Sequence, residues 1–193
     1  MGTTAARILA ALSATNEAIL YAKSPEELFQ KVCEAAFSSG DFLATAVFLL
    51  DEATGLLRLA TGVGDDIARL SSIEISTVAG TPEGSGVCGQ AFRDRALCIS
   101  NDFLNDARSL AWREGAEKGQ VGAAAALPLI CHEKSIGVLL VTKREPHSLT
   151  DKAVSMLGRI RPISAMRSTI SRARRHGRAA NWPPTGLTAC SLR

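Results

Sequence analysis

The feature that most constrains this chain is a pair of long apolar segments separated by a short polar link. Val121–Cys131 carries no charged residue, and Ile136–Val141 is apolar throughout. An earlier pair, Phe42–Leu50 and Leu56–Thr61, is separated by the turn sequence Asp51–Gly55. Apolar runs of this kind are typical of buried strands, and links this short are hairpin connections. The sequence therefore predicts an antiparallel sheet.

The helix with the clearest start follows Ser24. The Ser24 hydroxyl is placed to cap it, Pro25 suits the first helical position, and Glu27 completes a capping box. Apolar stripes at helical spacing predict two more helices, over residues 3–20 and from residue 151 to about 170. Helices are therefore expected at both ends of the folded region.

The segment between residues 62 and 120 mixes short helical patterns with turn sequences. Helices are predicted within Gly62–Leu70 and Val87–Arg93, and strands within Ser72–Val78 and Ala96–Ser100. We expect the terminal helices to pack side by side on one face of the sheet, and this segment to cover the other face and enclose a cavity. The predicted fold class is α+β.

The basic residues are unevenly distributed along the chain. Six of the 22 lie from Arg167 onward, where no acidic residue occurs, which leaves 16 basic against 19 acidic residues before that point. The helical pattern ends near residue 171, so we predict a domain over residues 1–170 and a basic, flexible tail over residues 171–193. The net charge of +3 therefore gives no evidence for a nucleic-acid partner.

Several classes of protein are disfavoured by what the sequence lacks. The longest uncharged apolar run, Val121–Cys131, is far shorter than the roughly 18 to 20 residues of a membrane span. The N-terminus has no signal-peptide pattern. The five cysteines include no CxxC pair, which argues against a disulfide framework and a zinc site. We expect a cytoplasmic protein with no membrane partner and no metal.

Four segments of the chain resemble the GAF domain family. They are the helix start Ser24–Leu28, the glycine-rich Gly84–Ala91, the strand and turn Ala96–Asp102, and the strand pair Ala126–Leu129 with Ile136–Leu139. The resemblance extends over roughly residues 5–170. It implies a PAS-related antiparallel sheet with strand order 2-1-5-4-3. It also implies small-molecule sensing and homodimerisation through the terminal helices, beside an effector of the histidine kinase or diguanylate cyclase type.

Alternatives are open for the residues that would line the implied pocket. Asp102 either accepts hydrogen bonds from a ligand or caps the next turn. Trp112 either stacks on a flat ligand or is a core aromatic with its N–H on a backbone carbonyl. The small side chains of Ala123–Ala126 either leave room for a ligand or let a helix pack closely. The ligand-binding candidates are Cys88, Ser100, Asp102, Phe103, Trp112 and Ala125.

Gly86–Ala91 and Cys98 are also similar to free methionine-R-sulfoxide reductases, which are stand-alone GAF enzymes. Those enzymes attack with a further cysteine just before the fourth strand of the sheet. Here the corresponding segment, Glu117–Ala124, contains no cysteine. Without a thiolate nucleophile the reaction has no first step, so we predict that the protein is not an enzyme and has no catalytic residues.

The cofactor is left unknown by the sequence. Haem needs an axial ligand from the pocket, whereas the three histidines fall in turns or in the tail. Bilin-binding relatives usually attach the chromophore through a Cys-His pair before the fourth strand, whereas Cys131-His132 lies in the following hairpin. Two functions are expected from the resemblance. One is a sensory module whose ligand shifts how the terminal helices pair, and the other is a ligand-free dimerisation module built on the same helices.

Overall fold

The computed structural model describes residues 24–39, 42–65, 67–131 and 133–150. The predicted helices over residues 3–20 and 151–170 lie outside these residues, as do the domain boundary at residue 170 and the basic tail.

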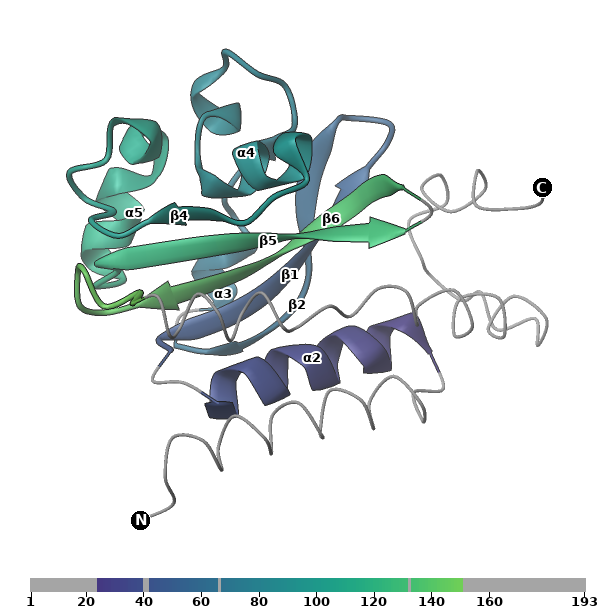
Figure 1. Cartoon of the computed structure of the whole chain (residues 1–193), viewed down its shortest axis with the longest axis horizontal. Coiled ribbons are helices and arrows are strands. Elements are labelled where there is room, and N and C mark those ends of the chain that lie inside the picture. The colour runs from purple at the N-terminus through teal and green to yellow at the C-terminus, as the bar shows by residue number, and fades with distance from the viewer. Residues whose placement is uncertain (1–23, 40–41, 66, 132, 151–193) are drawn as a thin grey trace.

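A six-stranded antiparallel sheet forms the centre of the fold (Figure 1). The strands are β1 (Ala44–Asp51), β2 (Leu56–Gly64), β3 (Ile75–Ser76), β4 (Cys98–Ser100), β5 (Ala123–Cys131) and β6 (Lys134–Lys143). Their order is β3-β2-β1-β6-β5-β4, and every neighbouring pair is antiparallel. When the two-residue β3 is set aside, the other five strands follow the predicted order 2-1-5-4-3. The α+β fold class and the sheet topology are therefore confirmed.

Helix α2 (Pro25–Ser39) covers one face of this sheet. It begins as predicted, because the Ser24 hydroxyl accepts a hydrogen bond of 3.2 Å from the Glu27 amide. Leu28 and Val32 point from the helix into a core cluster that includes Val47, Leu127 and Leu139 of the sheet. Burial of these side chains fixes the helix against the sheet.

Short helices cover the opposite face. They are α3 (Ile67–Leu70), α4 (Val87–Asp94), α5 (Arg113–Lys118) and the 3-10 turns η1 (Pro82–Gly84) and η2 (Ala107–Trp112). Figure 1 shows α4 and α5 on the side of the sheet away from α2. A second core cluster joins them to Phe48, Val138 and Leu140 of the sheet. The predicted cover over residues 62–120 is thus confirmed.

Strand β5 serves both layers because successive side chains point to opposite faces. Ala123 and Ala125 lie in the core cluster with α2, whereas Ala124 and Ala126 lie in the cluster with α4. All four are at most 1% exposed. One run of alanines is therefore divided equally between the two faces.

None of the helices that the structure describes is both long and apolar enough to span a lipid bilayer.

The end of β2 depends on a glycine. Gly64 pairs with Ala44 at a φ of +116°, and a Cβ at this position would lie 2.4 Å from the Leu43 carbonyl oxygen. We predict that Gly64→Ala lowers the free energy of unfolding by roughly 3 kcal/mol, through backbone strain and overpacking together. The matched control is Gly80→Ala, at a φ of +83° with open space around it, which should cost about 1 kcal/mol. Urea unfolding of both variants checks this, and equal losses would contradict the steric argument.

Candidate functional site

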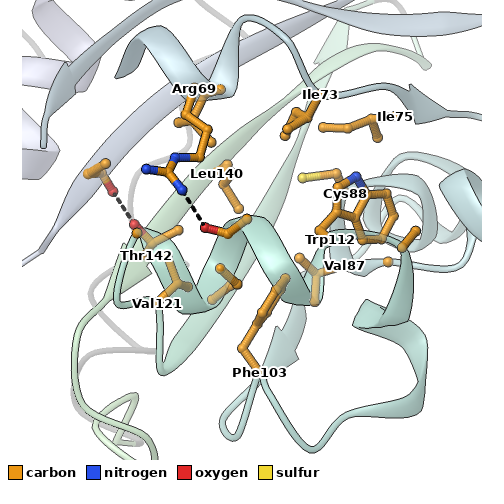
Figure 2. Close-up of a pocket in the computed structure, with 18 of the residues that line it drawn as sticks. Arg69, Ile73, Ile75, Val87, Cys88, Phe103, Trp112, Val121, Leu140 and Thr142 are labelled. Carbon is orange, nitrogen blue, oxygen red and sulfur yellow. Dashed lines mark hydrogen bonds between the residues drawn. The ribbon is translucent and has the colours of Figure 1, made fainter. Parts of the chain in front are cut away.

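A cavity of about 480 Å³ lies between the sheet and the segments that cross its α4 face. Its floor comes from β1, β5 and β6, where Ala44, Ala124, Leu140 and Thr142 line it. Figure 2 shows side chains from several segments around the space, with Leu140 near its middle, Phe103 below and Trp112 to the right. The volume lies within the range of roughly 300 to 1,000 Å³ that is usual for small-molecule sites.

Two of the side chains on the floor are small, and this leaves space between the sheet and the segments that cross it. Ala44 and Ala124 are buried and end at the methyl group, so the segments above the sheet do not reach down to it at this point. On the opposite face, Ala123 and Ala125 lie in the cluster with α2. On the cavity face, Ala124 borders the empty space and Ala126 lies in the core cluster that includes Val87 and Ala91 of α4.

Trp112 forms one end of the cavity. Its indole lies on Gly86, where an added Cβ would be 2.3 Å from ring atom Cζ3. The indole Nε1–H donates a hydrogen bond of 3.2 Å to the Glu74 carbonyl oxygen. The ring is therefore held both by a close backbone contact and by a hydrogen bond. A hydrogen bond from the indole N–H to a backbone carbonyl is the arrangement that the sequence suggested for a core aromatic.

Cys88 lies beside Trp112 on the wall contributed by α4 (Figure 2). Burial raises the pKa of its thiol to about 12. Burial also raises the pKa of the neighbouring Cys98 thiol, although the Arg108 guanidinium beside it acts in the opposite direction. Both thiols are therefore protonated at neutral pH, and Cys88 acts as an apolar lining residue.

The mouth of the cavity carries charge. Among the described residues that line it, Asp65, Glu74, Glu83 and Glu114 are acidic and Arg69 is basic. Asp65 pairs with Arg144 at 3.4 Å, and Glu114 pairs with Lys118 at 2.5 Å. The Arg69 guanidinium donates a hydrogen bond of 3.1 Å to the Gly115 carbonyl oxygen, which ties α3 to α5 across the opening.

An Asp106–Arg108 pair fixes η2, the segment that carries Trp112. Asp106 caps η2 by accepting from the Arg108 amide, and its carboxylate also accepts from the Arg108 guanidinium at 2.7 Å. The guanidinium reaches further to the Ile99 carbonyl oxygen and to Gln90 Oε1, both at 2.8 Å. The hydrogen bond to Arg108 is the main reason why the pKa of Asp106 falls to about 2. The pair therefore stays ionised and couples η2 to β4 and α4.

Three of the six predicted site residues line the cavity, namely Cys88, Phe103 and Trp112. Ala125 does not, because it points to the α2 face of the sheet, so its assignment to the pocket is corrected to Ala124. Asp102 is also outside the lining, and its carboxylate accepts from the Asn105 side chain at 2.9 and 3.0 Å.

Ser100 is the third predicted residue that is absent from the lining. It is buried in β4, and its hydroxyl makes no well-aligned hydrogen bond among the described residues, although it lies close enough to Asp106 to help lower the pKa of that carboxyl group. Arg69, Glu74 and Glu83, which line the mouth, were not predicted from the sequence. They come from three separate segments, so no local spacing could have grouped them.

Comparison with known proteins gives one family and many similar folds. A family model of the GAF domain matches residues 22–160. The search of curated proteins found no match. Among solved structures, free methionine-R-sulfoxide reductase from Neisseria meningitidis in complex with its substrate has a TM-score of 0.72 at 16% identity, covering 91% of this chain and 95% of that chain.

Two further solved structures extend the comparison. A putative GAF sensor protein from Burkholderia vietnamiensis has a TM-score of 0.69 at 16% identity, covering 90% of this chain and 99% of that one. The GAF domain of a phosphoenolpyruvate-protein phosphotransferase from Coxiella burnetii has a TM-score of 0.68 at 17% identity, covering 91% and 99%. Identities this low establish a shared fold.

The two alanines of β5 that face α4 provide a test of the cavity. Both lie in the core cluster that includes Val87 and Ala91, but of the two only Ala124 lines the cavity. We predict that Ala124→Leu changes the free energy of unfolding by less than about 1 kcal/mol, and that Ala126→Leu lowers it by about 1 to 3 kcal/mol through overpacking. Urea unfolding measures both, and an equal penalty would show that the cavity is not open.

Proposed function

The chain belongs to the GAF domain family, and on that premise we propose that it is a sensory module that binds a small organic molecule. The observation that carries this proposal is the cavity above Ala124, which is closed below by the sheet and walled by apolar side chains. A well-packed domain rarely leaves so much apolar space empty, because each unfilled volume forfeits packing energy. A ligand that fills the cavity would recover that energy.

Binding would act on the segments that close the cavity. The mouth lies between α3 and α5, which the Arg69–Gly115 hydrogen bond joins, and Trp112 links η2 to the residue before β3. A ligand that prefers one arrangement of these segments shifts the population toward it. We propose that the shift passes through the sheet to α2 and to the helices predicted from the sequence over residues 3–20 and 151–170.

We propose further that those helices pair with a second copy and control an effector domain or partner protein. Histidine kinases and diguanylate cyclases are the effector types that the family resemblance suggests. The homodimer and a cytoplasmic location remain predictions from the sequence.

The open space above the cavity floor allows a direct test for ligand binding. We predict that a thermal-shift screen of small apolar and amphipathic molecules raises the melting temperature of the wild-type protein for at least one compound. Mass spectrometry of protein purified without added ligand should release a co-purifying molecule if affinity is high.

The matched control for this screen is Ala124→Leu, which fills the site without disturbing α2. The shift should disappear in this variant. Compounds that stabilise both proteins equally bind elsewhere, and a screen without any cavity-dependent binder would instead favour a ligand-free dimerisation module.

We also propose that the protein has no sulfoxide reductase activity, although a reductase is among the solved structures of similar fold. Such chemistry needs an accessible thiolate. The segment before β5 contains no cysteine, and the thiol of Cys88, which lines the cavity, has a pKa of about 12. We predict that in a thioredoxin-coupled assay the wild-type protein turns over free methionine-R-sulfoxide no faster than the Cys88→Ala variant does. Turnover that the Cys88→Ala variant loses would overturn this conclusion.

A further inference from the structure

We propose that the ligand of this cavity is an organic cation, an amine or quaternary ammonium ion carried on an apolar body. This inference rests on the proposed sensory function, since it names the chemical class that the same cavity would take. Three observations carry it: the sign of the charge at the mouth, the two carboxylates that have no partner among the described residues, and the fixed aromatic ring of Trp112, which lines the same cavity.

The mouth favours a positive group. Four acidic residues and one basic residue line the cavity among the described parts of the chain. The carboxylates of Asp65 and Glu114 are neutralised by the nearby Arg144 and Lys118. Glu74 and Glu83 have no ion pair or hydrogen bond to their carboxylates anywhere in the described residues. Opposite charges attract and like charges repel. Two carboxylates without an ion pair therefore favour a cation in the cavity over an anion.

The aromatic ring of Trp112, which lines the same cavity, strengthens this preference. The indole donates its hydrogen bond to the backbone carbonyl of Glu74, and Glu83 lies three residues before Gly86, on which the indole rests. The face of an indole attracts ammonium groups, and tryptophan is the best of the aromatic side chains for this contact. The ring is already held in place, so a cation that reaches it orders no further side chain.

Arg69 does not reverse the sign of the site. Figure 2 shows it at the opposite side of the cavity from Trp112. Its guanidinium donates a hydrogen bond to the Gly115 carbonyl oxygen and contributes one positive charge, which is fewer than the two negative charges of Glu74 and Glu83. The interior between the two ends is lined by Ile73, Val87, Phe103 and Leu140, which suit an apolar body.

The experiment uses the Trp112 indole as the reporter. The chain has two tryptophans, so Trp182→Phe in the full-length protein leaves Trp112 as the sole emitter. Three probes of similar size are titrated at low ionic strength: benzyltrimethylammonium, benzyl alcohol and phenylacetate. They share a phenyl body and carry a positive, a neutral and a negative head group. The charge variant is Glu74→Gln with Glu83→Gln, and its control is Glu52→Gln, an exposed carboxylate in the β1–β2 turn.

We expect benzyltrimethylammonium to bind roughly tenfold more tightly than phenylacetate. The double variant should weaken binding of the cation about threefold for each carboxylate removed, whereas Glu52→Gln should leave it unchanged. The advantage of the cation should shrink in 1 M NaCl, because salt screens exposed charges.

Tighter binding of phenylacetate, or a double variant that binds the cation as wild type does, overturns the proposed class of ligand. Benzyl alcohol separates that result from failure of the sensory function. If benzyl alcohol binds and Ala124→Leu abolishes the binding, the cavity binds small molecules but the proposed preference for a cation is wrong. If none of the probes binds, the cation proposal fails, and the sensory proposal is decided by the thermal-shift screen.

Discussion

The strict alternation of side chains along β5 is the constraint on which the rest of the structure depends. The strand is buried on both faces, and its four alanines are shared equally between them. On one face the small side chains face α2, and on the other they leave the space that the cavity occupies. A shift of β5 by one residue would turn Leu127 and Leu129 from the α2 face to the opposite face, so the register with β6 and β4 preserves both layers together.

The cover over the cavity is held by polar contacts as well as by apolar packing. Asp106 and Arg108 fasten η2 to β4 and α4, the Trp112 indole reaches the backbone before β3, and Arg69 bridges α3 and α5. Each contact joins segments that are far apart in sequence. Short helices gain little stability by themselves, so these links hold the cover in one arrangement while leaving it able to adopt another.

Much of the fold could be predicted from the sequence, because the signals for it are local. The capping sequence at Ser24 and the two apolar hairpins specify α2 and the centre of the sheet. The site was predicted less well. An unbroken apolar strand gives no period-two signal, so the face of Ala125 could not be assigned. Glu74 and Glu83 line the same cavity as Trp112 only through the fold, and that grouping has no counterpart in sequence spacing.

The protonated thiol of Cys88 has a consequence for how long a signal would last. With a pKa of about 12, this sulfur is a poor nucleophile at physiological pH, which disfavours a covalent bond with any occupant of the cavity. Occupancy then follows the free concentration of the occupant, and its decay is set by the dissociation rate alone. The domain would therefore report present conditions and keep no record of past ones.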